Sequence, residues 1–244
     1  MISKNQIKLI KSLQQKKYRK QHKKFVAEGV KVIQELLNSN YDLAELFTTQ
    51  EQLFEVDKDK IHLVSESELK SISCLVTPNL CLAIFSIPNQ PEIPPTNALQ
   101  LVLDDIRDPG NLGTIIRLAD WFGITSVVCS PSTVDAYNPK VIQATMGSIA
   151  RVNLWYVHLK EYLSEAKTPV YGTFLEGESI YKESLLKPCL IVLGNESNGI
   201  SKEIEKKVTH KITIPQFGMV HQTESLNVAT ATAIILSEFC RDTK

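Results

Sequence analysis

Hydrophobic and polar residues follow two different spacings along the chain, and these spacings predict its helices and strands. Apolar positions at Ile7, Ile10 and Leu13, with lysines on the opposite side, predict an amphipathic helix near the N-terminus. Short apolar runs further on are typical of buried strands. In the first 87 residues we expect strands at 42–49, 61–65 and 80–87, a strand, turn and helix over 25–39, and a helix over 65–72.

The second half alternates strands and helices regularly. Apolar runs predict strands at 99–105, 125–130, 152–157, 169–175, 189–194 and 210–215. Helical spacing predicts helices at 111–122, 138–147, 159–166, 201–208 and 225–241. Such alternation indicates an α/β fold with a parallel sheet covered by helices on both faces.

Local signals add a cap and a domain boundary to this pattern. Ser65 followed by Glu68 is the spacing of a capping box, which would begin the helix over 65–72. Four prolines in the stretch PNQPEIPPTNA exclude regular structure there and indicate a linker. We therefore expect an N-terminal domain over residues 1–87, a linker over 88–97 and a C-terminal domain over 98–244.

Charge is neutral in total but unevenly placed. The chain holds 27 basic and 27 acidic residues, and residues 1–24 contain eight lysines, Arg19 and no acidic residue. The rest of the chain therefore carries 18 basic and 27 acidic groups. Such a basic segment is either a contact for the phosphate backbone of a nucleic acid or simply a solvated helix face.

Other features exclude several classes of protein. No apolar run is long enough to span a membrane, and the charged N-terminus lacks a signal-peptide core, so we expect a cytoplasmic protein. The five cysteines form no CxxC pair and lie mostly in apolar stretches, so we expect buried thiols and neither a zinc site nor disulfides.

Three strand ends in the second half carry unusual polar loops, and in a parallel sheet ligands bind at the carboxyl ends of strands. In the first loop, DPGNLGTIIR, Asn111 can cap the following helix and Arg117 follows within two helical turns. In the second, LGNESNGIS, glycines let backbone amides approach a ligand, and Ser201 can cap a helix. A plain capped helix or a plain turn remains an alternative for both.

The third loop lies between the strand that ends at Pro215 and the last helix. Ser225 is expected to begin that helix, with Asn227 in its first turn, and Gly218 and His221 lie in the loop. Ser225 lacks a G-x-S-x-G context, so a capping or binding role is favoured over covalent catalysis. The chain also lacks the glycine patterns of dinucleotide sites and P-loops, and the HExxH zinc motif.

Together the three loops resemble the SpoU (TrmH) family of RNA 2'-O-ribose methyltransferases. The first resembles the family's N-x-G-x-x-x-R element, the second its G-x-E-x-x-G element, and the third its I-P…S-L-N-V element. The matching positions are Asn111, Gly113, Arg117, Gly194, Glu196, Gly199, Ile214, Pro215, Ser225, Leu226, Asn227 and Val228. The N-terminal part resembles the L30e-like substrate-binding domain of many members.

The resemblance implies a fold, a cofactor and a site. It implies a C-terminal trefoil knot of the SPOUT type, a homodimer, S-adenosyl-L-methionine as methyl donor and no metal. Positions carried over place the cofactor at Leu193, Gly194, Ile214, Leu226, Asn227 and Ala229. The same comparison places the catalytic site at Arg117, Asn111, Glu196, Ser225 and Asn227. The loop over 216–224 departs from the family by its length, so contacts with the substrate or cofactor can differ there.

The implied reaction is transfer of a methyl group to a ribose 2'-hydroxyl of RNA. Arginine is a poor base because its pKa exceeds about 12, so Arg117 is expected to stabilise negative charge on the hydroxyl oxygen. Glu196 is expected to hold the Arg117 guanidinium. Ribosomal RNA is favoured over transfer RNA because of the extra N-terminal domain.

Two other classes of protein remain as alternatives. A non-catalytic RNA-binding protein could keep the fold without binding the cofactor, although the chain has both Arg117 and the Gly194 loop. A small-molecule α/β enzyme such as a dehydrogenase is disfavoured by the missing dinucleotide motif and by the basic N-terminal segment.

Overall fold

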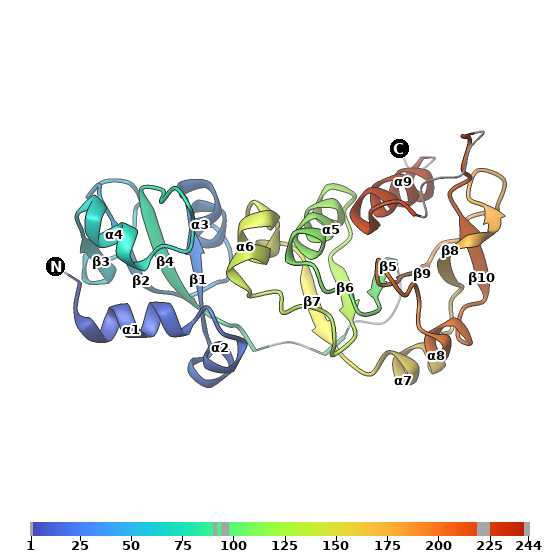
Figure 1. The fold of residues 1–244 in the computed structure, drawn as a ribbon, viewed down its shortest axis with the longest axis horizontal. Helices are drawn as coiled ribbons and strands as arrows, with labels where there is room; N and C mark the ends of the chain where they lie inside the picture. Colours follow the sequence, from blue (N-terminus) through green and yellow to red (C-terminus); the bar gives the residue numbers. More distant parts are fainter. Residues whose placement is uncertain (1, 90–91, 94–97, 219–224, 242–244) are drawn as a thin grey trace. The chain divides into compact units, whose positions relative to one another are not determined.

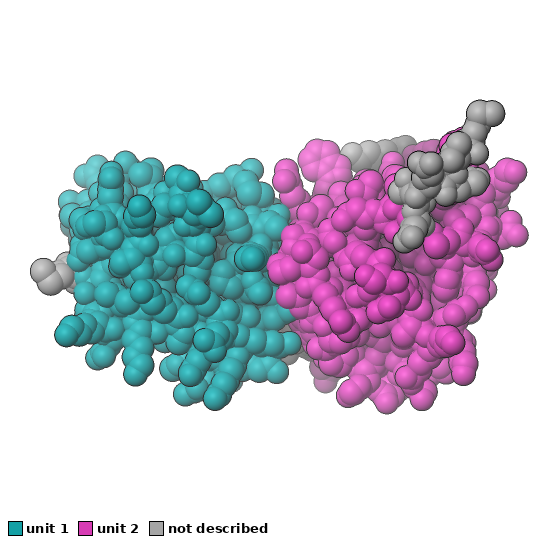
Figure 2. Space-filling view, viewed as in Figure 1, with its two compact units in different colours: residues 1–90, 135–151 teal, residues 91–134, 152–244 magenta. Residues whose placement is uncertain are grey.

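The computed structural model describes residues 2–89, 92–93, 98–218 and 225–241 (Figure 1). Parts of the predicted linker and of the loop over 216–224, including His221, lie outside the described residues. The chain forms two compact units (Figure 2). Unit 1 comprises residues 1–90 and 135–151, and unit 2 comprises residues 91–134 and 152–244.

Unit 1 is built on a four-stranded sheet. Its strands are β1 (Lys24–Glu28), β2 (Leu43–Thr48), β3 (Ile61–Leu63) and β4 (Cys81–Ser86), in the order β1-β4-β2-β3. β4 is antiparallel to β1 and β2, whereas β3 is parallel to β2. The strands predicted in this half are therefore confirmed.

The described part of unit 1 also contains α-helices and short 3-10 helices, several of which bury apolar side chains. They are α1 (Lys4–Ser12), α2 (Lys16–His22), α3 (Val30–Leu37), η1 (Lys58–Lys60), α4 (Glu66–Ile72), α6 (Pro139–Thr145) and η2 (Ser148–Ala150). Ile10 and Leu13 are fully buried in a core that includes Leu69 of α4 and Leu82 of β4. The predicted capping box of α4 is present, with Ser65 and Glu68 bonded reciprocally.

Residues 135–151 pack within unit 1 although the sequence division places them in the C-terminal domain. Asp135 accepts two hydrogen bonds from the buried Arg19 guanidinium, at 2.8 and 2.6 Å. The Tyr137 ring lies 4.9 Å from that of Phe25, centroid to centroid, and Arg151 pairs with Glu35. These tertiary contacts explain why α6 groups with unit 1, and a linker-based boundary has no means of detecting them.

Unit 2 is built on a six-stranded, wholly parallel sheet. Its strands are β5 (Leu99–Leu103), β6 (Ser126–Cys129), β7 (Asn153–Tyr156), β8 (Val170–Ser179), β9 (Cys189–Leu193) and β10 (His210–Thr213). Their order is β10-β8-β9-β5-β6-β7. The predicted α/β fold with a parallel sheet is thus confirmed, and β5 and β9 are neighbours at its centre.

Helices cover both faces of the unit 2 sheet. The helices α5 (Pro109–Trp121) and α9 (Val228–Cys240) pack side by side on one face, and α7 (Leu159–Ser164) and α8 (Lys202–Glu205) lie on the other (Figure 1). On the α7–α8 face, Val102, Val128 and Val192 are buried with Leu159 and Ile204. Alternate strand residues turn to opposite faces, so both faces are apolar, as near-continuous hydrophobic strands require.

The thiols agree only in part with the expectation of burial. Cys81, Cys129 and Cys189 are buried, Cys240 is half-buried, and Cys74 is exposed. Burial raises the pKa of the Cys81 and Cys189 thiols to about 12. Within the described ranges, no helix is both long enough and apolar enough to cross a membrane.

Candidate active site

Asp108, and not Asn111, caps the helix α5 that follows β5. Asp108 has extended backbone angles, as expected for a residue before proline, and its Oδ1 accepts from the Asn111 backbone N–H at 2.8 Å. Pro109 is the first residue of the helix, where its missing N–H matters least. The predicted cap was wrong because Asn111 already lies in the first turn, and this leaves the Asn111 side chain available for other contacts.

Asn111 joins three loops that are far apart in the sequence. Its Nδ2 donates to Glu196 Oε1 at 2.6 Å, and its Oδ1 accepts from Asn227 Nδ2 at 2.9 Å. Asn227 is the N-cap of α9, and its own Oδ1 accepts from the backbone N–H groups of Ala229 and Thr230. Each of these three side chains is therefore oriented by another, and the predicted convergence of Asn111, Glu196 and Asn227 is present.

The loop after β9 is folded tightly on itself. Asn195 and Gly199 exchange backbone hydrogen bonds of 3.0 and 2.8 Å, and Gly199 has a φ of 66°. A Cβ atom on Gly194 would lie 2.3 Å from the Gly199 carbonyl carbon, so only glycine fits there. Gly194 and Gly199 are therefore explained by closure of the loop itself, which presents Glu196 at its tip.

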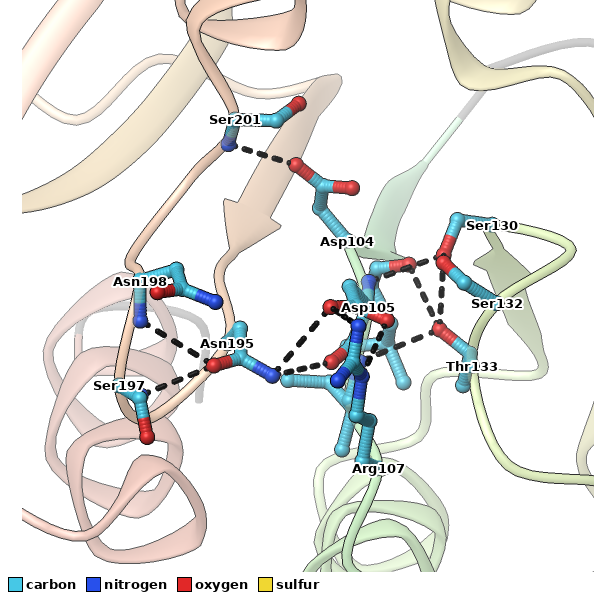
Figure 3. Close-up of polar contacts among 12 residues, drawn as sticks. Asp104, Asp105, Arg107, Ser130, Ser132, Thr133, Asn195, Ser197, Asn198 and Ser201 are labelled. Carbon is cyan, nitrogen blue, oxygen red and sulfur yellow. Dashed lines mark hydrogen bonds and ion pairs between the residues drawn. The ribbon is translucent and has the colours of Figure 1, made fainter.

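A polar network fixes this loop to the end of β5 (Figure 3). The buried Asn195 donates through Nδ2 to the Asp105 carbonyl at 2.8 Å, and its Oδ1 accepts from the backbone N–H groups of Ser197 and Asn198. At the far end of the loop, the backbone N–H of Ser201 donates to Asp104 Oδ2 at 2.8 Å. Both ends of the segment that carries Glu196 are thus attached to one strand end.

Asp105 itself has a positive φ of 61°, which is unusual for a residue other than glycine. Its backbone N–H donates to Ser130 Oγ at 2.9 Å, and its carboxylate pairs with Arg107. The Asp105 carboxylate raises the pKa of the Arg107 guanidinium through a hydrogen bond and its charge. The surrounding contacts therefore hold the chain in a conformation that Asp105 alone would not prefer.

The third loop enters α9 later than predicted. Ser225, Leu226 and Asn227 are exposed and not helical, and the helix begins at Val228. Ser225 therefore does not begin the helix, because the Asn227 side chain takes the capping position. Leu226 is 47% exposed, and Phe217, on the other side of the loop's undescribed part, is 83% exposed. Both apolar side chains are therefore accessible to a ligand or partner.

Arg117 is exposed on the outer face of α5. At about 100° per residue, it lies roughly a third of a turn around the helix from Asn111, on an adjoining face. Within the described residues its guanidinium has no hydrogen-bond or ion-pair partner. The expected bond from the Arg117 guanidinium to Glu196 does not occur among the described residues; Glu196 accepts from Asn111.

The residues expected to hold the cofactor lie on the same strand ends and loops. Leu193 and Ala229 are buried, Gly194 and Ile214 are half-buried, and Leu226 and Asn227 are exposed. Within the part of the chain that is described, the backbone N–H and carbonyl of Leu226 make no hydrogen bond. An exposed leucine with free backbone groups, flanked by the polar Ser225 and Asn227, fits the adenosine part of S-adenosylmethionine, which needs apolar contact and a few polar partners.

Sequence reasoning missed three residues that shape the site: Asp104, Asp108 and Asn195. Asp108 was detectable, because Asp before Pro at a helix start is a capping signal. The bonds from Asn195 to Asp105 and from Ser201 to Asp104 join residues 90 and 97 positions apart, so no local pattern reveals them. No group of three or more potential metal-ligating side chains occurs among the described residues.

Comparison with known proteins identifies the family. The family described as SpoU rRNA methylase matches residues 98–237, and a domain described as MRM3-like substrate binding matches residues 4–83. The chain is similar to the 23S rRNA (guanosine(2553)-2'-O)-methyltransferase of Bacillus subtilis, with 32% identity over 96% of each chain. It is also 28% identical to the mitochondrial rRNA methyltransferase 3 of Xenopus laevis, over 95% of this chain and 72% of that protein.

Solved structures agree with this assignment. An RNA methyltransferase assigned to the TrmH family, from Porphyromonas gingivalis, superimposes with a TM-score of 0.90 at 40% identity, covering 99% of both chains. An AdoMet-bound rRNA methyltransferase from Sinorhizobium meliloti gives a TM-score of 0.87 at 29% identity, over 99% of this chain and 97% of that one. Since the family match covers more than half of the chain and the motifs lie together in the structure, the chain belongs to the SpoU family of RNA methyltransferases.

Proposed function

We propose that this chain transfers a methyl group from S-adenosyl-L-methionine to a ribose 2'-hydroxyl of ribosomal RNA. The observation that carries the proposal is the contact of Asn111 with both Glu196 and Asn227, which unites the three family motifs in one polar cluster. The Bacillus subtilis relative is named for the same reaction on 23S rRNA, and the Sinorhizobium meliloti relative was solved with AdoMet.

The positions of the side chains indicate which residues bind the cofactor and which act on the ribose. Leu193, Gly194, Ile214, Leu226, Asn227 and Ala229 are the proposed cofactor-binding residues. When bound, the cofactor supplies a methyl group made electrophilic by its sulfonium sulfur. The exposed segment around Leu226 offers apolar contact and free backbone groups for that ligand, whereas Leu193 and Ala229 are buried and shape the pocket from behind.

The catalytic role that we assign to Arg117 is electrostatic. Its guanidinium is a planar cationic donor that forms no hydrogen bond or ion pair with any described residue, so it can bind the 2'-oxygen as negative charge develops there. Glu196 orients the Asn111 amide, and Asn111 in turn orients Asn227. Asn111, Glu196, Asn227 and the exposed Ser225 then provide the polar wall against which the ribose is positioned.

The remaining parts of the proposal concern assembly. We propose that residues 1–87 form the RNA-binding domain and residues 98–244 the methyltransferase domain, with a trefoil knot. We also propose a homodimer that uses the outer face of α5, where Trp121 is 84% exposed one helical turn beyond Arg117. The bacterial rRNA relative supports the cytoplasm as the compartment.

Replacement of Arg117 by alanine tests the reaction. Because Arg117 is exposed and its side chain forms no hydrogen bond or ion pair with a described residue, Arg117→Ala should leave the melting temperature and S-adenosylmethionine binding by calorimetry unchanged. Methyl transfer should fall by a factor of about one hundred or more, the scale seen when an electrostatic stabiliser is removed. The assay is incorporation of labelled methyl into transcribed 23S rRNA fragments, with 2'-O-methylation located by mass spectrometry.

Arg117→Lys is the matched control, since it retains the charge but not the planar donor pair. It should retain more activity than Arg117→Ala. Near-normal turnover in Arg117→Ala would remove the proposed role. A wild-type protein that binds RNA but shows no heat of S-adenosylmethionine binding would instead support the alternative of a non-catalytic RNA-binding protein.

A further inference from the structure

The first 24 residues form a basic surface on two short helices. α1 carries lysines at positions 4, 8 and 11, and α2 with its flanks carries lysines at 16, 17, 20, 23 and 24. All of these except the half-buried Lys24 are exposed. Among the described residues, no carboxylate pairs with Lys8, Lys11 or Lys20. The surface therefore has positive charge that the protein itself does not neutralise.

The one arginine of this segment is used differently. Arg19 is only 2% exposed, and its guanidinium donates to Asp135 Oδ2 through Nε and Nη2 and to the Leu13 carbonyl through Nη1. Both partners belong to unit 1. Arg19 thus attaches α2 to the end of α1 and to residue 135, and it holds the neighbouring lysines outward on a fixed helix.

Two aromatic rings lie on the same helix among the lysines. The rings of Tyr18 and His22 are one helical turn apart, 6.4 Å between centroids, with their planes inclined by 21°. The Lys17 ammonium lies 5.8 Å from the centre of the Tyr18 ring. Tyr18 is half-buried and His22 is exposed. Nearly parallel rings beside lysine ammonium groups suit single-stranded nucleic acids, since bases stack on rings and phosphates bind cations.

We propose that the α1–α2 surface binds an unpaired stretch of the substrate RNA, with a base stacked on Tyr18 and His22 and phosphates on Lys17 and Lys20. This inference rests on the proposed function for the identity of the polymer. The rings select single strands over duplex, because bases within a duplex are already stacked on each other. An acidic protein would be attracted by the lysines alone and would gain little from the rings.

The test uses the full-length protein and a fluorescein-labelled, mixed-sequence RNA of about 20 nucleotides, a length that exceeds the footprint of one binding fold. The same sequence annealed to its complement provides the duplex probe. Lys17→Glu/Lys20→Glu should weaken single-strand binding at least tenfold. It should also flatten the slope of log Kd against log salt by about 1.4, since each phosphate contact contributes about 0.7 on a single strand.

Lys167→Glu/Lys182→Glu is the matched control, because both lysines are exposed, lie outside this surface and outside residues 1–87, and produce the same change in net charge. It should leave the salt slope unchanged. Equal losses in the two double variants would overturn the proposal, because the effect would then be one of net charge. Binding of poly-L-glutamate with the same sensitivity to the Lys17 and Lys20 changes would favour an acidic protein and also count against it.

Tyr18→Ala tests the stacking directly. It should weaken single-strand binding about fivefold or more, the effect of one lost base stack, while the salt slope and duplex binding stay unchanged. Tyr18→Phe should bind as the wild type does. Loss in Tyr18→Phe, or equal loss on both probes, would refute stacking. S-adenosylmethionine binding is also measured by calorimetry in the wild type and in every variant. A wild type that does not bind S-adenosylmethionine would contradict the proposed function, whereas the RNA-binding results above would still decide the proposal for this surface.

Discussion

At the scale of single residues, Asn111 has the most consequential position in unit 2. Its amide donates to a carboxylate and accepts from a second amide, so it requires both a donor and an acceptor in one side chain. Neither aspartate nor alanine supplies both. Because the contacts are near the surface, their loss should affect the geometry of the site more than the stability of the fold.

Asn111→Asp should make activity depend on pH in a specific direction. A carboxylate at position 111 would lie beside Glu196, and two like charges at hydrogen-bond distance raise the pKa of one of them. Protonation at lower pH would restore a donor between the two groups. The ratio of variant to wild-type methyl transfer should therefore rise as pH falls from about 8 to about 6, a range above the ordinary carboxyl pKa.

Asn111→Ala is the comparison, since it removes both hydrogen bonds and introduces no titrating group. Its activity relative to wild type should be low and independent of pH. A flat ratio for Asn111→Asp as well would mean that the contact with Glu196 does not contribute to the reaction.

At the scale of elements, the loop over 195–201 behaves as one unit attached to the end of β5. Asn195 at the start of the loop donates to the Asp105 carbonyl, and Ser201 at its end donates to Asp104 (Figure 3). Asp104 and Asp105 directly follow the central strand β5. The parallel pairing of β5 with β9 brings these segments together. Glu196 lies in the turn before α8 (Lys202–Glu205), so its position is set by the attachment of this loop to the sheet and not by a helix.

Asn195→Ala should loosen this loop. The substitution removes the hydrogen bond that Asn195 donates to the Asp105 carbonyl and the two that it accepts from the backbone N–H groups of Ser197 and Asn198. The Asn195 residue is only 9% exposed, so water cannot readily replace these bonds. Unsatisfied buried groups of this kind cost about 1–3 kcal/mol, so the free energy of unfolding in urea should fall by that amount. Methyl transfer should fall too. Ser197→Ala is the control, because its backbone N–H contact survives, and equal effects of both changes would refute the role of Asn195.

At the scale of the whole molecule, the outer face of α5 is the surface that we propose for assembly. Arg117 and Trp121 lie one turn apart on it, and the inner face is occupied by α9 and the sheet. An exposed tryptophan beside an arginine is a composition typical of protein interfaces. In a dimer formed through this face, assembly and catalysis would depend on neighbouring positions of one helix.

Trp121→Glu should separate such a dimer. A charge in the centre of an apolar contact is poorly tolerated, so the variant should sediment as a monomer at concentrations where the wild type is a dimer. Its circular dichroism should be unchanged, because the side chain is 84% exposed in the single chain. Glu161→Gln is a control on another exposed helix face. A wild type that sediments as a monomer would contradict the homodimer.

Much of this protein was determined by local sequence. The strands of both sheets, the parallel arrangement in unit 2 and the capping box at Ser65 follow from short-range patterns, because side-chain periodicity and caps act within one or two turns. The family motifs also marked Asn111, Glu196 and Asn227 before their contacts were visible.

Tertiary structure alone decided the rest. Residues 135–151 pack within unit 1, and the buried Arg19 guanidinium donates to Asp135. Glu196 accepts a hydrogen bond from Asn111 and not from Arg117. In each case the partners are separated by 85 or more residues, and their pairing depends on which strand ends and helices meet in space. Local periodicity does not predict such long-range contacts, since it specifies only which face of a helix or strand is buried.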